Sequence, residues 1–135
     1  MRMHLLLLTF SVAIIGCADS VVNVSGKVTL DKKALANATV LFEPAPDQTG
    51  LGAGAHGKTD ANGEYSLSLM TKETKGAAPG KYIVKISAYD GDPGDNSDST
   101  KVPKQLVPER YNIKTKLTFD VPAAGTTSAN FDLEK

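Results

Sequence analysis

The sequence predicts an all-β fold: a sandwich of about seven short strands that follows an N-terminal export signal. Apolar residues recur at every second position in several short segments, which is the period of a half-buried strand. Turn-forming glycine, proline, asparagine and aspartate residues separate these segments. After the N-terminal apolar run, no stretch of 11 residues has a helical period, and no fixed-length repeat suggests a solenoid or propeller.

Residues 1–16 have the pattern of a secretory signal peptide. Arg2 gives a positive start, and the 11 residues 5–15 are almost wholly apolar. A helix that spans a bilayer needs about 20 such residues, so a permanent transmembrane helix is not expected. Small residues follow the run, and ordinary cleavage after Ala18 would leave Gly16 at position −3.

The end of the apolar run, Ile14-Ile15-Gly16-Cys17, resembles a bacterial lipobox. That resemblance implies that Cys17 is thioether-linked to diacylglycerol and becomes an acylated N-terminus. Two or more acyl chains anchor a protein stably, whereas one holds it only marginally. The alternative is a free buried cysteine that packs as a small hydrophobe, but its place directly after the apolar run favours lipidation. The expected organisation is a signal peptide (1–16), a short tether (17–23) and one domain (24–135).

Composition narrows the classes of partner. The chain has 15 basic and 15 acidic side chains, and removal of Arg2 with the signal peptide leaves 14 against 15. There is no basic field to hold nucleic acid. Cys17 is the only cysteine, so no disulfide can form within the chain, and the domain must depend on strand packing.

Seven segments are expected as strands, each with its apolar residues directed inward. They are residues 24–30, 38–43, 55–59, 64–69, 80–89, 117–121 and 128–133. Residues 31–34 and 60–63 are expected as turns, the second because Asp60 and Gly63 suit the first and fourth positions of a type I turn. Residues 107–112 are expected to cross the sandwich irregularly, with Tyr111 as a buried plug.

With these residues laid out, the chain is similar to the carboxypeptidase regulatory-like, transthyretin-like domain. The similarity lies in residues 24–30, 38–40, 59–65, 79–82, 107–112 and 129–133. In particular the chain resembles short lipoproteins of planctomycete-type bacteria that carry this domain alone after a lipobox. The resemblance implies a seven-stranded Greek-key, prealbumin-like sandwich, no enzymatic activity, no known ligand and a periplasmic or surface location. The chain departs at residues 31–34, where the family usually has glycine, and Lys32 in a left-handed position would be strained.

Candidate chemistry is sparse. A transthyretin-like hydrolase would need several histidines, whereas the predicted mature chain has only His56, with Arg110 as its only arginine. These residues supply neither a nucleophile–base pair nor the three or four ligands of a zinc site. The glycines of residues 47–54 lack the strand, helix and lysine of a phosphate-binding loop.

Two ligand sites stay open. Asp90, Asp92, Asp95 and Asp98 share a polar loop whose oxygens suit calcium, although the spacing is not that of an EF-hand. The alternative for this loop is a solvated, flexible connection. A glycan platform would depend on Tyr89, since the chain has no tryptophan and its other tyrosines are expected to face inward.

The sequence therefore predicts a non-catalytic, cofactor-free β-sandwich at the cell envelope, anchored by lipidated Cys17 and facing the periplasm or the exterior. Its expected role is that of a structural or protein-interaction module whose partner is another envelope component. The alternative is an extracytoplasmic module that binds a glycan, or binds calcium through residues 90–98.

Overall fold

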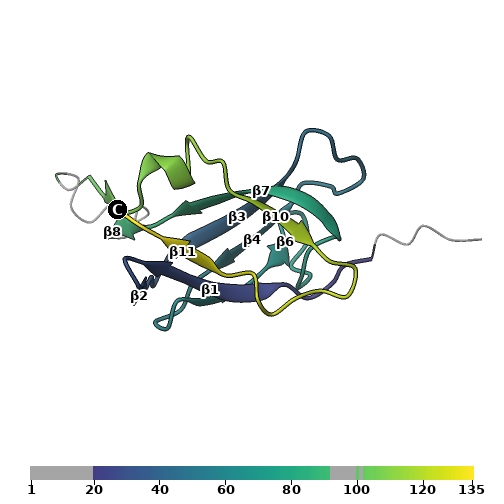
Figure 1. Cartoon of the computed structure of the whole chain (residues 1–135), viewed down its shortest axis with the longest axis horizontal. Coiled ribbons are helices and arrows are strands. Elements are labelled where there is room, and N and C mark those ends of the chain that lie inside the picture. The colour runs from purple at the N-terminus through teal and green to yellow at the C-terminus, as the bar shows by residue number, and fades with distance from the viewer. Residues whose placement is uncertain (1–19, 92–99, 101) are drawn as a thin grey trace, which may run out of the picture.

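The computed structural model describes residues 20–91, 100 and 102–135, and these form an all-β structure (Figure 1). The only helical element among them is a single 3-10 turn, η1 (Glu109–Tyr111). The strands are β1 (Ser25–Leu30), β2 (Lys33–Ala34), β3 (Thr39–Pro44), β4 (Ala55–Lys58), β5 (Glu64–Ser66), β6 (Ser68–Leu69), β7 (Gly80–Ser87), β8 (Tyr89–Asp90), β9 (Lys104–Gln105), β10 (Thr118–Val121) and β11 (Phe131–Leu133).

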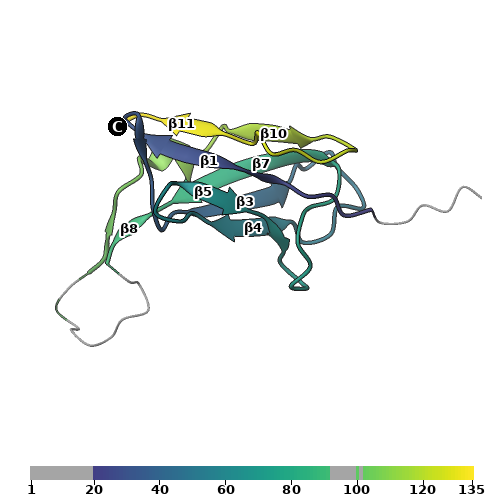
Figure 2. The ribbon, with the colours of Figure 1, turned by 90° about the horizontal axis from the view of Figure 1, so that it is seen from below.

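Two sheets stack as layers, consistent with a β-sandwich (Figures 1 and 2). In the first sheet β1 lies next to β11, with β2 and β5 paired to different parts of its other edge. The second sheet has the order β10-β7-β3-β4-β6, and β8 and β9 form a separate ribbon. Among the strands of the described residues, all pairs are antiparallel except β1 with β11. The first described residues lie at the end of the sandwich opposite β8 (Figure 1).

The core lies between the layers and is built by the expected alternation. Strand β7 follows the pattern most clearly, because its inward residues Tyr82, Val84 and Ile86 are at most 1% exposed. Phe42 of β3 is fully buried, and its ring centroid lies 5.6 Å from that of Tyr82 and 6.2 Å from that of Phe131. Such tilted and edge-on contacts add to burial, so Phe42 joins the two sheets.

Two predicted strands are each interrupted. The segment expected as one strand over 64–69 is β5 and β6, which belong to different sheets. Leu67, between them, donates its N–H to the Val24 carbonyl and accepts from Gly76, and its side chain is buried. The strand expected over 80–89 stops at Ser87, because the Ala88 N–H donates to the Gln105 side chain. Alternation alone predicts which residues face inward, but not which sheet they join.

The turns follow local chemistry. The Asp60 carboxylate accepts the N–H groups of Asn62 and Glu64, and Gly63 takes a φ of 75°, as a residue in the left-handed region. Between β1 and β2, Asp31 and Lys32 both have positive φ, at 50° and 65°. Positive φ at both central residues is the geometry of a two-residue type I′ hairpin. The turn thus keeps its left-handed form without glycine.

Tyr111 is not the enclosed plug that the sequence suggested. Its ring is half-buried against the core, and the neighbouring Asn112 is the residue that is buried. The Asn112 amide nitrogen lies 3.1–3.3 Å from the carbonyl oxygens of Ile86, Val107 and Pro108. A buried amide that satisfies main-chain carbonyls explains why a polar residue occupies this place.

Candidate functional site: the tether, the loops and a free sheet edge

Cys17 lies outside the described residues, so the predicted lipid attachment stays a prediction. Regular pairing begins soon after it, at the bridge between Val22 and Ala77. Only residues 18–21 separate Cys17 from this bridge, and four extended residues reach about 14 Å. No helix in the described part of the chain has the length and apolar character needed to cross a bilayer.

The predicted calcium loop is described only at its start. Asp90 is exposed and stands opposite Lys104 in the register of β8 and β9. Asp92, Asp95 and Asp98 lie outside the described residues. Within residues 20–91, 100 and 102–135 there is no cluster of three or more histidine, cysteine or acidic side chains able to hold a metal. Calcium binding at this loop therefore stays a prediction.

The two candidate catalytic side chains occupy different surroundings. His56 is exposed on β4, between Leu41 of β3 and Ser68 of β6. Arg110 belongs to η1, where it donates to the Glu134 carbonyl and its guanidinium carbon lies 4.9 Å from the centre of the Tyr111 ring. The described contacts give neither residue a nucleophile to activate.

Most of the tyrosines contribute to the fold rather than to an exposed binding surface. Tyr65 and Tyr82 are buried as predicted, and burial raises the pKa of both phenols. The Tyr65 hydroxyl donates to the Ala129 carbonyl oxygen at 2.6 Å and ties β5 to the segment before β11. The pKa of Tyr111 is lowered, first by the Glu134 N–H that its hydroxyl oxygen accepts and then by Arg110. Tyr89, at 43% exposure, is the exposed tyrosine that a glycan platform would need.

A polar hollow of about 680 Å³ lies against β1 and β5. Lys27 and Lys58 line it together with Asp60 and Glu64, so its charges offset each other. Two of its polar side chains already bind the main chain: the Asp60 carboxylate caps its turn, and Asn130 Oδ1 accepts the Lys27 N–H. The hollow has the polarity of a ligand site without a set of free groups that converge on one point.

The sequence predicts that a sandwich has edge strands, but it did not show which strand has a free edge. The Leu117 carbonyl accepts the Val84 N–H, so the main-chain groups of Leu117 face β7. Because antiparallel pairs alternate, those of Phe119 and Val121 also face β7, while those of Thr118 and Asp120 face away from it. On that side they meet no strand within the described residues. Of the strands at sheet edges there, β10 is the longest.

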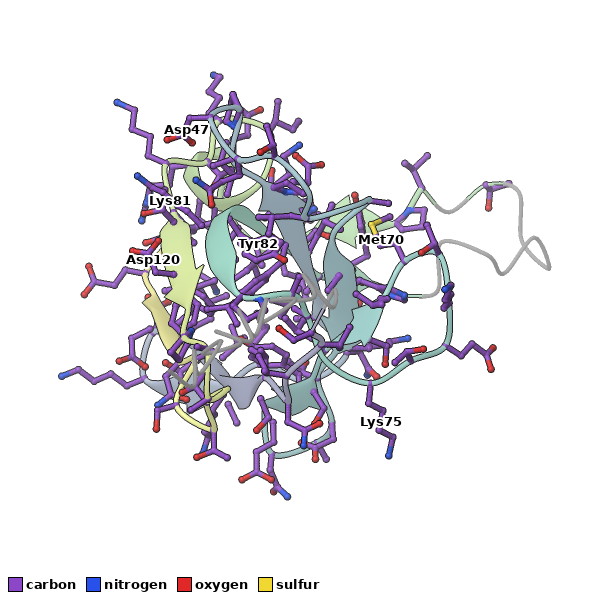
Figure 3. All side chains as sticks on the ribbon, turned by 90° about the vertical axis from the view of Figure 1, so that its right-hand side faces the viewer. Asp47, Met70, Lys75, Lys81, Tyr82 and Asp120 are labelled. Atoms are coloured by element: carbon purple, nitrogen blue, oxygen red, sulfur yellow. The ribbon has the colours of Figure 1, made fainter. Side chains whose placement is uncertain are left out.

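Thr118 and Asp120 are exposed on the outer face of the second sheet, and exposed Lys116 lies two residues before β10 with the same alternation. Asp120 stands opposite Lys81 of β7, and Figure 3 shows the two side chains on the same flank of the sandwich. The alternation of these residues is visible in the sequence. Whether β10 is a central or an edge strand depends on the order of strands, which the sequence does not state.

Comparison with known proteins gives no relative. No family model, no curated protein and no solved structure matches the chain.

Proposed function

We propose that the chain is a non-catalytic, lipid-anchored β-sandwich of the cell envelope that acts as a structural or protein-interaction module. The observation that carries the proposal is the sequence Ile14-Ile15-Gly16-Cys17 at the end of a short apolar run. A domain of strands whose pairing starts at Val22 follows it directly. Such a chain would have an attachment point, a spacer of a few residues and a folded domain.

The proposed fold in detail is the seven-stranded Greek-key sandwich of the carboxypeptidase regulatory-like, transthyretin-like kind. Seven of the eleven strands in the described part of the chain have three or more residues, which supports this proposal. Further support comes from the turn at Asp60, which lies where the resemblance requires it. The remaining strands, β2, β6, β8 and β9, have two residues each.

The positions of the two ends of the sandwich support the role of an interaction module. The described chain starts at one end of the sandwich, while the β8–β9 ribbon lies at the other end (Figure 1). A lipid at Cys17 would hold the starting end within about 14 Å of the membrane surface. The ribbon, with exposed Tyr89 and the exposed Leu106 that follows β9, would then face away from the membrane and toward other envelope components.

Fractionation of bacteria that express the full chain tests the anchor. Wild type is expected in the membrane fraction and is released by detergent but not by high salt. Cys17→Ser removes the thiol that the lipid transfer requires, so it is expected to lose the lipid and change its electrophoretic mobility. Ser20→Ala, three residues further on in the tether, is the matched control and is expected to behave as wild type. Unchanged mobility and detergent-dependent membrane retention of Cys17→Ser would show that the anchor proposal is wrong.

Recovery of partners tests the interaction role separately. The full chain, carrying a C-terminal affinity tag, is purified from detergent-solubilised envelopes, and co-purifying proteins are identified by mass spectrometry. A reproducible envelope protein at near-stoichiometric amount, or a second copy of the chain, is the expected result. Turnover of an added ester, amide or glycoside substrate by the purified protein would contradict the non-catalytic part of the proposal.

A further inference from the structure

We propose that a second copy of this chain pairs antiparallel with β10 (Thr118–Val121), centred on Thr118, so that the two second sheets join into one continuous sheet. The inference deepens the proposed interaction role by naming the partner, and it does not depend on lipidation. It starts from the unpaired main-chain groups of Thr118 and Asp120 on the outer side of β10. An edge with unpaired groups is a template for another strand.

The register follows from the side chains that share this edge. If Thr118 of each copy stands opposite the other, Lys116 of one copy stands opposite Asp120 of the second, and the reverse. In an antiparallel pair, opposed residues have Cβ atoms about 5 Å apart, within reach of a lysine–carboxylate pair. Both residues are exposed on the same outer face, so the pairing brings two opposite-charge pairs together. The edge is therefore complementary to itself.

The two neighbouring registers of this antiparallel pairing are less favourable. A shift toward the C-terminus sets Lys116 against Pro122, which has no N–H to donate. A shift toward the N-terminus sets Asp120 against Lys114, which lies in the turn after η1 and already pairs with the Glu109 carboxylate at 3.0 Å. The register centred on Thr118 sets the two Thr118 residues opposite each other as a hydrogen-bonded pair and brings both ion pairs together, with Lys116 just before each strand.

The other sheet edges are less suited to pairing with a second copy. Strands β2 and β6 have two residues each, and β6 is covered by the bridge between Ser68 and Lys75. Strand β11 has three residues, and the N–H of the following Glu134 is taken by the Tyr111 hydroxyl. Strand β5 lies close to β4 on its open side, since a Cβ on Gly57 would come 2.5 Å from the Ser66 carbonyl oxygen. The geometry thus selects β10 for the second copy.

Charge reversal tests the pairing through its register. In Lys116→Glu both ion pairs become acid–acid contacts, and in Asp120→Lys both become base–base contacts. Each variant alone is expected to weaken self-association of the detergent-solubilised full chain by about tenfold or more. Sedimentation over a concentration series measures the effect. Lys58→Glu, on β4 away from β10, is the matched control and is expected to leave the association unchanged.

A mixture of the two variants separates this register from a general charge effect. When Lys116→Glu pairs with Asp120→Lys, both cross-strand pairs again join opposite charges, so the mixed dimer is expected to recover near wild-type affinity. Two different affinity tags allow capture of the mixed dimer to be compared with capture of each variant by itself. All three substituted positions are exposed, and equal melting temperatures would show that the folds are intact.

Three results would overturn the proposal. The first is wild-type protein that stays monomeric at the highest soluble concentration. The second is a mixture that associates no better than its two components. The third is an unrelated envelope protein that binds at β10 and whose capture, rather than self-association, responds to the charge changes. Each of these outcomes is compatible with membrane attachment through Cys17, so failure here is distinguishable from failure of the anchor.

Discussion

Replacement of Tyr65 by phenylalanine tests the polar link between the first-sheet strands. The phenol is 4% exposed, and its hydroxyl donates to the Ala129 carbonyl at 2.6 Å. Ala129 is fully buried, so the carbonyl left behind loses this donor without replacement by water. A carbonyl in that state costs about 1–3 kcal/mol, and no cavity larger than one oxygen atom is created. We expect Tyr65→Phe to lower the free energy of unfolding by about 1.5 kcal/mol at pH 7.

The raised pKa of Tyr65 also determines whether the free energy of unfolding rises or falls with pH. Burial raises the pKa of Tyr65 above the value of 10.0 that the phenol has when exposed. Above pH 10 the unfolded chain releases this proton and the folded chain keeps it, so the unfolded state binds fewer protons and stability falls as pH rises. The loss is about 1.4 kcal/mol for each pH unit above 10. Tyr65→Phe lacks this loss, so the two curves should converge near pH 11.

Urea denaturation followed by circular dichroism at pH 7, 9 and 11 measures both effects. Tyr89→Phe is the matched control, because Tyr89 is 43% exposed, and its effect should stay within about 0.5 kcal/mol at every pH. Tyr82 remains in both proteins, so its own raised pKa cancels in the comparison. A deficit of Tyr65→Phe that is the same at pH 7 and pH 11 would refute the reasoning.

Three further substitutions test the close contacts and turns by urea or thermal denaturation. Gly26→Ala would place a Cβ 1.9 Å from the Ala129 carbonyl oxygen, and we expect a loss of at least about 3 kcal/mol, with Ser25→Ala near neutral. Asn112→Ala removes the two amide N–H groups that three carbonyls share and should cost about 2–3 kcal/mol; a cost below 0.5 kcal/mol would count against the buried amide. Lys32→Gly relieves a φ of 65° and should raise stability by about 0.5–1 kcal/mol, and a lower melting temperature would contradict the strained hairpin.

Local pattern was enough to predict most of the core. The inward residues of β7 and β11 alternate in the sequence, and each of them is buried in the structure, as Val84, Ile86 and Leu133 illustrate. The turn at Asp60 was likewise predictable, because an aspartate that caps its own turn acts within a few residues. These features depend on neighbours in the chain, and the sequence contains all of the relevant neighbours.

Features that depend on distant neighbours were not predictable. The division of residues 64–69 at Leu67 arises because the first half pairs with β1 and the second half pairs with β4. Burial of Asn112 depends on carbonyls from β7 and from the segment before η1, which the chain brings together only when folded. The free edge of β10 follows from the order of five strands, and no single segment records that order.

The intact mass of the mature protein, purified from membranes in detergent, tests the central claim most directly. The account predicts a chain that begins at Cys17 and carries a diacylglyceryl group and a further acyl chain on that residue. Fragmentation should place the whole added mass on Cys17. An unmodified chain that begins at Asp19, as ordinary cleavage after Ala18 would leave, or a chain that retains Met1 would contradict it.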